Sequence, residues 1–297
     1  MELRTLRYFT AVAEAGTVSA AAAALHVTQP GLSRQLRRLE RELGVALFDR
    51  ISGRLTLSAA GRALLPRARD VIAQAEHLGL DAKILATGQL NRLTVAAPAT
   101  TLAEVVAPFI ATLEPHDPVP SVFASDGFEP EEALRRGADL VIVNGRPGGA
   151  LKSLALAVLP VWAYVPAGHE WAHSQAVHIE AVVRETVISL PETFTARQML
   201  AAACLTSGLA LHVGIEASSG AVTQALAAAG RGVAVVTDDP RFELHPLEIM
   251  VRGGALSIRL FAAWDPQHPG ASTLASISNR LSEYIIDRYG DSVQPSS

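Results

Sequence analysis

The chain has 297 residues, 49% of them hydrophobic, which excludes a disordered chain and is enough for several layers of core and more than one domain. Residues 1–70 hold eleven arginines against six acidic residues, a net charge of +5, whereas the remainder carries −9, so the first part predicts a polyanionic partner. The single cysteine excludes an intrachain disulfide. The lack of a signal sequence and of an apolar run of about 18 residues predicts a cytoplasmic protein that does not enter a membrane.

Two short helices are expected at the start of the chain. The first covers Leu6–Glu14 and ends at Gly16, because glycine is favoured just past a helix C-terminus. The second is rich in alanine, the strongest intrinsic helix former, and covers residues 17–25. A turn at residues 26–27 then leads into a third helix.

The third helix is expected from Gln29 to about Leu43, with Gly44 at its end, and it has two distinct faces. Thr28 is expected as its N-cap and Pro30 in its first turn, where the missing N–H costs little. Leucines spaced by four, three and four residues form a stripe that packs inward. These are Leu32, Leu36, Leu39 and Leu43. A polar stripe consists of Gln29, Ser33, Arg37 and Arg41, with Arg34 and Arg38 beside it.

A β-hairpin is expected over residues 47–57. Apolar residues alternate on both sides of Ser52-Gly53, a dipeptide typical of a turn. Arg50 and Arg54 would lie at the flank and tip of this ribbon, where they can reach phosphates or a minor groove. Three helices followed by such a ribbon form a winged helix-turn-helix.

The polar stripe of the third helix carries the side chains that read DNA. In the major groove arginine pairs bidentately with guanine and glutamine with adenine, while hydroxyls and further arginines hold phosphates. A charged stripe by itself also fits a solvated helix face, but the capped turn before it and the basic hairpin after it favour DNA. Base-reading and groove contacts are expected from Gln29, Pro30, Ser33, Arg34 and Arg37. Phosphate contacts are expected from Thr28, Arg38, Arg50 and Arg54.

One set of residues in this region matches a known family in register. They are residues 6–9, 12–16, 21–22, 25–30, 32–36, 39–40, 43–44, 47–50 and 60–61, beginning LRYF and including LHVTQP and LSRQL. With them the chain resembles the LysR-type transcriptional regulators. The resemblance implies a bacterial regulator with a DNA-binding domain at 1–58, a dimerising linker helix at 59–89 and a two-lobed effector domain of the periplasmic-binding-protein type at 90–297. It further implies a homotetramer built as a dimer of dimers, which contacts RNA polymerase if it is an activator.

Residues after Ser58, the expected N-cap, predict one long helix that ends at Gly88, the expected hinge. Seven residues step strictly by four and three, the pattern of a coiled-coil seam. The alternative is a single amphipathic helix lying on its own domain. Pairing two such helices in a dimer would present two DNA-binding domains to a two-fold symmetric DNA site. The seam residues are Leu64, Ala68, Val71, Ala75, Leu78, Ala82 and Leu85.

From residue 92 onward, short apolar strands alternate with helices, which predicts mostly parallel sheets covered on both faces. Buried strands are expected at 93–97, 121–124, 139–143, 159–165, 186–190, 232–236 and 257–263. Helices are expected at 102–113, 131–136 and 222–229. By resemblance there are two lobes, one at 90–161 plus 267–297 and the other at 162–266. The crossovers are expected near Pro160–Pro166 and Trp264–Pro269, and a helix at 274–288 would return to the first lobe.

Three loops after expected strands are candidates for ligand binding, since ligands in such folds bind at the carboxyl ends of strands against helix N-termini. They cover residues 98–101, 125–128 and 191–195, and their hydroxyls and free N–H groups suit an anionic or polar small molecule. By resemblance these loops line the inducer cleft, although each residue also fits an ordinary loop or capping role. The candidates are Thr100, Thr101, Phe128, Thr193 and Thr195, followed by Asn144, Arg146, Arg197 and Thr237.

Enzyme motifs are missing from the sequence: there is no G-x-S-x-G, H-E-x-x-H, P-loop or C-x-x-C. His169 and His173 stand four residues apart but have no matching Cys or carboxylate set, so neither metal nor cofactor is expected. Cys204 lies in an apolar helical segment and is expected to be buried and unreactive. The sequence therefore predicts a regulator that binds promoter DNA and responds to a small molecule. The alternatives are a sensing module whose winged helix contacts proteins, and a DNA-binding enzyme acting on its own ligand.

Overall fold

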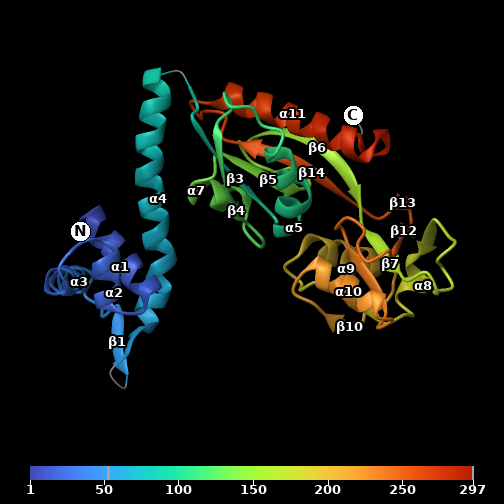
Figure 1. Ribbon diagram of the computed structural model, residues 1–297, viewed down its shortest axis with the longest axis horizontal. Helices are drawn as coiled ribbons and strands as arrows, with labels where there is room; N and C mark the ends of the chain where they lie inside the picture. The colour runs from blue at the N-terminus through green and yellow to red at the C-terminus, as the bar shows by residue number, and fades with distance from the viewer. Residues whose placement is uncertain (52–53, 88, 296–297) are drawn as a thin grey trace. The chain divides into compact units, whose positions relative to one another are not determined.

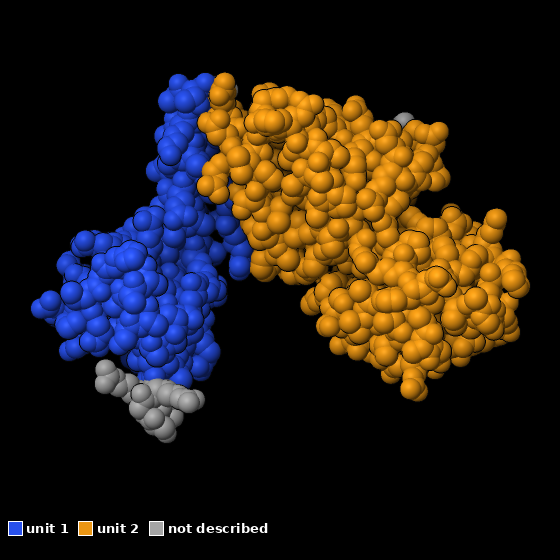
Figure 2. Space-filling model, in the orientation of Figure 1, with its two compact units in different colours: residues 1–87, 135–137 blue, residues 88–134, 138–297 orange. Residues whose placement is uncertain are grey.

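The computed structural model describes residues 1–51, 54–87 and 89–295, apart from the side chains of Arg50, Ile51 and Arg54. The chain divides into two compact units, Met1–Thr87 with Arg135–Gly137, and Gly88–Leu134 with Ala138–Ser297 (Figure 2). No helix in the described ranges is both long and apolar enough to cross a membrane.

The first unit begins with the three predicted helices (Figure 1). They are α1 (Leu3–Ala15), α2 (Val18–Ala24) and α3 (Gln29–Leu43). The N-caps of α2 and α3 are hydroxyls: Thr17 Oγ1 accepts from the N–H of Ala20 at 3.1 Å, and Thr28 Oγ1 from that of Gly31 at 3.3 Å. Leu32, Leu36 and Leu39 are buried in a core shared with Leu6, Phe9, Val12, Ala21, Ala22 and Leu47. Leu43 was expected in this stripe but is exposed, because the helix ends there and passes the edge of the core.

The predicted hairpin forms from β1 (Phe48–Ile51) and β2 (Arg54–Leu57), which pair antiparallel with Phe48 opposite Leu57. Glu40 on α3 fixes its start, since Oε1 accepts from the N–H of Leu47 at 2.8 Å and from that of Phe48 at 3.4 Å. The expected turn at Ser52-Gly53 lies outside the described residues, as do the side chains of Arg50 and Arg54.

The linker helix α4 (Ala59–Thr87) begins where predicted, because Ser58 Oγ accepts from the N–H of Gly61 at 2.9 Å. The expected hinge, Gly88, lies outside the described residues. The predicted seam is divided: Ala68 is buried in the core of the first unit and Leu64 packs against that core. Only the stripe from Val71 onward is exposed, and this corrects the expectation that all seven residues are free to pair.

The first lobe of the second unit is built on a five-stranded sheet in the order β4-β3-β5-β14-β6. Its strands are β3 (Arg92–Ala97), β4 (Val119–Ala124), β5 (Leu140–Asn144), β6 (Lys152–Pro160) and β14 (Ser257–Trp264). Strand β3 runs parallel to β4 and β5, whereas β14 runs antiparallel to β5 and β6. The prediction of mostly parallel sheets was therefore wrong. So was the prediction of a buried strand at 121–124, because β4 is an edge strand with Val119 and Val122 exposed.

The helices of this lobe include one continuous helical segment after β3, formed by α5 (Ala99–Thr101), a π-helical turn (Leu102–Val106) and α6 (Ala107–Ile110). Two further helices are α7 (Pro130–Arg135) and α11 (Ala271–Tyr289), and α11 is followed by a 3-10 turn (Asp291–Val293). Helix α11 packs along β6, so the C-terminal helix returns to the first lobe as predicted (Figure 1).

The second lobe contains a seven-stranded mixed sheet in the order β10-β9-β11-β7-β12-β13, with β8 beside β12. Its strands are β7 (Trp162–Val165), β8 (Ala176–His178), β9 (Val187–Ser189), β10 (Val213–Glu216), β11 (Val233–Val236), β12 (His245–Val251) and β13 (Gly254–Ala255). Its helices are α8 (Ile179–Val182), α9 (Thr195–Thr206) and α10 (Gly220–Ala228). Cys204 is buried on α9, and burial raises the pKa of its thiol, which agrees with an unreactive cysteine.

The chain passes between the two sheets at Val161 and at Leu256. The single strand expected at 159–165 is therefore two strands in different sheets. The crossover expected at Trp264–Pro269 is wrong, because β14 pairs with β5 and β6 over residues 257–264. Those residues belong to the first lobe, and both crossovers lie side by side between the lobes (Figure 1).

Candidate functional site

The polar face of α3 is the first candidate site. The inward stripe of leucines holds the helix against the core, so the opposite face projects into solvent. The exposed residues are Thr28, Gln29, Pro30, Arg34, Arg37 and Arg38, and Ser33 is half-buried. The cap at Thr28 fixes where the helix begins, and therefore which side chains stand in its first two turns.

The arginines on this face differ in how far their charge is neutralised. Arg38 Nε lies 3.0 Å from Glu42 Oε1, and the chain's own amino terminus together with Arg38 lowers the pKa of Glu42. Arg34 and Arg37 make no ion pair with the residues that the structure describes. Arg41 donates from Nε to the carbonyl oxygen of Arg37 at 3.3 Å. Arg34, Arg37 and Arg41 therefore have no carboxylate partner among the described residues, whereas the charge of Arg38 is shared with Glu42.

Other arginines of the first unit connect its helices. Arg7 Nη2 lies 3.0 Å from Glu76 Oε1, and Arg69 Nη2 lies 2.8 Å from Glu14 Oε1, so two ion pairs join α1 to α4. Both pairs are exposed and each contributes little, about 0–1 kcal/mol. They leave the face of α3 unobstructed.

The loops predicted to bind a ligand fall into two groups in the second unit. Thr100, Thr101 and Thr195 line a small cavity of about 20 Å³ together with Asn144 and Thr237. A larger groove of about 630 Å³ is lined by Phe128, Thr193 and Thr195, together with Arg146. Two predicted residues line both: Thr195 at the start of α9 and Asn144 at the end of β5.

One of the N–H groups expected to be free in the loop after β3 is occupied. The N–H of Ala99 donates to Asp126 Oδ2 at 2.9 Å, so a carboxylate of the neighbouring loop already occupies the start of that helix. Asp126 lines the small cavity and the groove alike. An anionic ligand at this position would meet a negative charge instead of unpaired donors.

Arg197 lies in neither the small cavity nor the groove. Its side chain is 13% exposed, and its nearest acidic atom is Glu192 Oε1 at 4.0 Å. Its Nε and Nη1 are buried and have no hydrogen-bond partner among the described residues. The structure therefore places Arg197 outside the lining of both sites.

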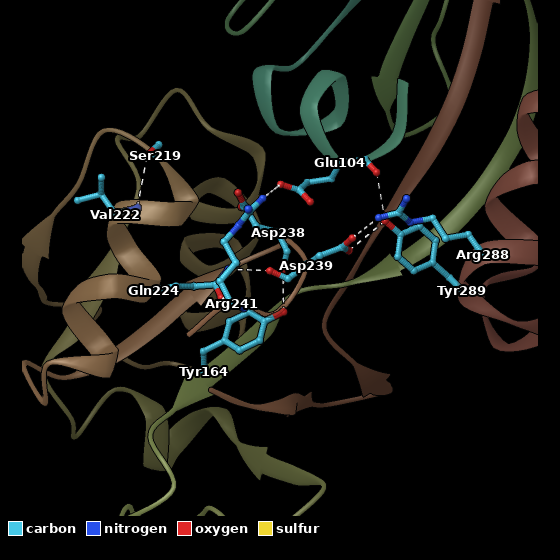
Figure 3. Close-up of polar contacts among 10 residues, drawn as sticks. All are labelled: Glu104, Tyr164, Ser219, Val222, Gln224, Asp238, Asp239, Arg241, Arg288 and Tyr289. Carbon is cyan, nitrogen blue, oxygen red and sulfur yellow. Dashed lines mark hydrogen bonds and ion pairs between the residues drawn. The ribbon is translucent and has the colours of Figure 1, made fainter. Parts of the chain in front are cut away.

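A third cavity, of about 410 Å³, lies between the lobes beside the two crossovers. It shares Thr100, Thr101 and Thr237 with the small cavity. Two polar clusters flank it (Figure 3): Arg241 of the second lobe pairs with Glu104 of the first, and Asp239 accepts from Arg288 Nη2 at 2.6 Å and from the Tyr289 hydroxyl at 3.0 Å. These contacts join the lobes directly.

Asp238 is the most deeply buried acid next to this cavity. Its Oδ2 has no hydrogen-bond partner among the described residues, and burial, followed by the negative charge of Glu104, raises its pKa to about 6. A Cβ at Gly220 would lie 2.0 Å from the carboxyl carbon, so glycine is required where α10 begins. The Tyr164 hydroxyl donates to the backbone oxygen of Asp238 at 2.7 Å (Figure 3).

Two family models match most of the chain. The model described as "Bacterial regulatory helix-turn-helix protein, lysR family" matches residues 3–62. The model described as "LysR substrate binding domain" matches residues 86–283, which is more than half of the chain. The chain belongs to the LysR family of transcriptional regulators.

Relatives in the LysR family match this chain over different lengths. The regulator TfdT of Cupriavidus pinatubonensis is 38% identical over 112 residues, 38% of this chain and 49% of TfdT. TcbR of Pseudomonas sp. is 46% identical over 96 residues, 32% of this chain and 33% of TcbR. These two matches span half or less of the relatives' length. The dual regulator GltC of Bacillus subtilis is 27% identical over 251 residues, 83% of this chain and 84% of GltC.

Solved LysR-family structures share the fold. CbnR in complex with its target DNA has a TM-score of 0.72 at 22% identity, covering 95% of this chain and all of that one. A full-length OxyR variant from Pseudomonas aeruginosa has a TM-score of 0.64 at 22% identity, covering all of this chain and 98% of that one. A helix-turn-helix, a long helix and a two-lobed α/β domain in this order are therefore common to all three.

In this LysR-family chain, sequence reasoning missed the acidic and basic residues between the lobes. Asp238 and Asp239 directly follow β11 at its carboxyl end, the same signal that singled out the threonine loops. Of that loop, the sequence pattern predicts only Thr237 as a ligand contact. The pairing of Glu104 with Arg241 had no sequence signal, because 137 positions separate the partners.

Proposed function

We propose that this LysR-family protein binds promoter DNA through α3 and the β1–β2 wing and switches transcription when a small molecule binds between its effector lobes. The observation that carries the proposal is the polar face of α3, where Arg34 and Arg37 are exposed and make no ion pair with the described residues. A helix with such a face, preceded by a turn and a second helix, enters the major groove.

Each side chain on this face has a chemical role in the proposed complex. Gln29, Ser33, Arg34 and Arg37 read base edges, and Pro30 packs against the groove wall. Thr28, Arg38, Arg50 and Arg54 contact phosphates, which position the helix without reading sequence. Because the guanidinium of Arg38 forms an ion pair with Glu42, it contributes less to the phosphate contact than an unpaired arginine would.

The proposed assembly is a homotetramer, a dimer of dimers that pairs through the exposed part of the α4 seam. Two DNA-binding domains related by a two-fold axis match a two-fold symmetric DNA site, and linked domains bind DNA more tightly than one domain does. With promoter DNA as partner, the protein would work in the cytoplasm, and as an activator it would contact RNA polymerase. We propose no catalytic role, since the relatives are regulators.

The proposed switch is an equilibrium between lobe arrangements. A polar effector that contacts both lobes favours the arrangement to which it binds more tightly, and it can shift the equilibrium only by that difference in affinity. Thr100, Thr101, Phe128, Thr193 and Thr195 remain the proposed contacts for such a ligand. The lobe arrangement in turn changes the distance between the DNA-binding domains of the assembly.

The test is binding of wild type and the Arg34→Ala variant to the DNA just upstream of the protein's own gene, over a salt series. Wild type should bind specifically and lose affinity steeply with salt, because phosphate contacts release counterions. Arg34→Ala should bind at least roughly tenfold more weakly to its specific site, the value of one bidentate base contact. Arg231→Ala, which removes an exposed arginine in the second lobe, is the matched control and should behave as wild type.

Equal and weak binding by all three proteins would contradict the proposal. It would favour the alternative in which the winged helix of a small-molecule sensor contacts another protein.

A further inference from the structure

We propose that the cavity of about 410 Å³ between the effector lobes binds a small organic cation, an ammonium or guanidinium group carried on an apolar body. The inference builds on the proposed function in one respect only, namely that this cation would act as the effector. It replaces the anionic ligand that the loop sequences suggested, and of the contacts proposed above only Thr100 and Thr101 line this cavity.

The cavity has the size and position of an effector site. Its volume falls in the range of roughly 300–1,000 Å³ that is common for small-molecule sites. Its walls come from both lobes, with Glu104 from the first and Asp239 from the second, and from the crossover strands at Pro160 and Ser257. A ligand here would contact both lobes and the segments that join them, so its binding depends on how the lobes are arranged.

The charged side chains of the lining all have the same sign. They are Glu104, Asp239 and Glu248, and no Lys, Arg or His is among the lining residues of the described chain. Glu104 is paired with Arg241, and Asp239 with Arg288. Glu248 is exposed and forms no ion pair within residues 1–51, 54–87 and 89–295, so it is the carboxylate that remains free for a ligand cation.

The surroundings of the cavity are also negative. Asp238 lies beside Asp239 and is buried, so three carboxylates, those of Glu104, Asp238 and Asp239, face the guanidinium groups of Arg241 and Arg288 (Figure 3). Burial contributes most to the raised pKa of Asp238, and the further rise caused by the charge of Glu104 agrees with a negative local potential. Such a potential attracts a cation and disfavours a carboxylate ligand.

The free carboxylate stands next to an aromatic ring. Glu248 on β12 is directly opposite Trp162 on the antiparallel strand β7, which places both side chains on the same face of the sheet. Indole is the ring to which cations bind most strongly. A cation placed between Glu248 and Trp162 gains an ion pair and a cation–π contact at once.

The rest of the wall suits an apolar body. Val105, Leu159 and Ile258 line the cavity near Trp162 and the ring of Tyr289. Hydroxyls of Thr100, Thr101, Thr237 and Ser257 add a few hydrogen-bonding positions. This combination fits an amine on an aromatic or branched aliphatic skeleton.

The experiment compares two probes of similar shape and opposite charge, 2-phenylethylamine and 3-phenylpropionate. Binding to the full-length protein is measured by calorimetry and thermal shift without DNA. The amine should bind and raise Tm, and 3-phenylpropionate should not. Glu248→Gln should weaken amine binding about two- to fivefold, the range expected for one exposed ion pair. Glu180→Gln, which alters an exposed glutamate elsewhere in the second lobe, should match wild type.

Three outcomes would overturn the inference. The first is that 3-phenylpropionate binds as tightly as the amine, and the second is that the amine does not bind at about 10 mM, which marks very weak affinity. The third is that the amine binds Glu248→Gln as tightly as it binds wild type. The Arg34→Ala variant separates this inference from the proposed function. If that variant loses DNA binding but keeps amine binding, both stand. If neither protein binds DNA specifically while the amine still binds, the cation site stands and the regulatory role fails.

Discussion

Asp238 is the residue whose charge the fold accommodates least well. Burial raises its pKa from 3.8 to about 6, with Glu104 adding to the effect. A carboxyl group whose pKa is higher in the folded than in the unfolded state binds its proton more tightly when folded. Its effect on stability is therefore absent below about pH 4, grows between pH 4 and 6, and is fully destabilising above pH 6.

The Asp238→Asn substitution should remove this destabilisation while keeping the shape of the side chain. We expect its free energy of unfolding at pH 7 to exceed that of wild type by roughly 1–3 kcal/mol, the upper value being the full pKa difference. Urea unfolding at pH 4, 5, 6 and 7 measures this difference. The variants should converge toward pH 4. Asp287→Asn, at an exposed position on α11, should follow wild type, and equal pH slopes for all three proteins would disprove the account.

At the scale of single residues, the sequence predicts positions whose partners are close in the chain. The cap at Thr28 follows from its place before Pro30, and the exposure of Arg34 follows from the leucine period. Asp126 as the cap of Ala99 could not be predicted, because 27 residues separate them and only the parallel pairing of β3 and β4 brings their loops together.

At the scale of elements, α4 depends on a close approach at its first turn. A Cβ at Gly61 would lie 2.1 Å from the carbonyl oxygen of Leu47, so any side chain there would push the linker helix away from the start of the wing. The Ser58 hydroxyl strengthens the same junction by donating to the carbonyl oxygen of Ala46 at 2.6 Å. The junction fixes the wing relative to α4.

Gly61→Ala should destabilise the first unit by about 1–3 kcal/mol, the usual cost of overpacking, although alanine is the better helix former. Thermal unfolding followed by circular dichroism measures the effect. Gly79→Ala on the same helix is the matched control, since a Cβ there meets nothing within 4 Å. That control should gain about 0.5–1 kcal/mol. A Gly61 variant as stable as the Gly79 variant would contradict the steric explanation.

Helices were easier to predict than sheets for a physical reason. The ends of α3 and the start of α4 are set by caps within three or four residues, and these came out as predicted. The sequence pattern predicts only the last two residues of β6, and it places β14 on the wrong side of a crossover. Both strands owe their place to pairing with each other across about a hundred residues, and a local apolar pattern does not reveal such a partner.

At the scale of the whole molecule, the assembly depends on apolar side chains that a single chain leaves in water. Val71, Leu78 and Leu85 on α4 are 43%, 72% and 75% exposed and recur every seven residues. Burying them against a second copy of α4 is favourable by roughly 25 cal/mol per Å² of apolar area. The residues before them, Leu64 and Ala68, instead anchor the helix in its own unit.

Leu78→Asp should therefore separate the copies, because each would place a carboxylate in an apolar seam opposite its equivalent. Sedimentation should show a fall from the wild-type assembly to a smaller species, while circular dichroism stays unchanged. Affinity for the specific DNA site should drop at least about tenfold, because the DNA-binding domains are no longer linked. Lys83→Asp introduces the same residue at an exposed position on α4 outside the seam and should keep both assembly and affinity. If Leu78→Asp sediments as wild type does, the copies pair through another surface.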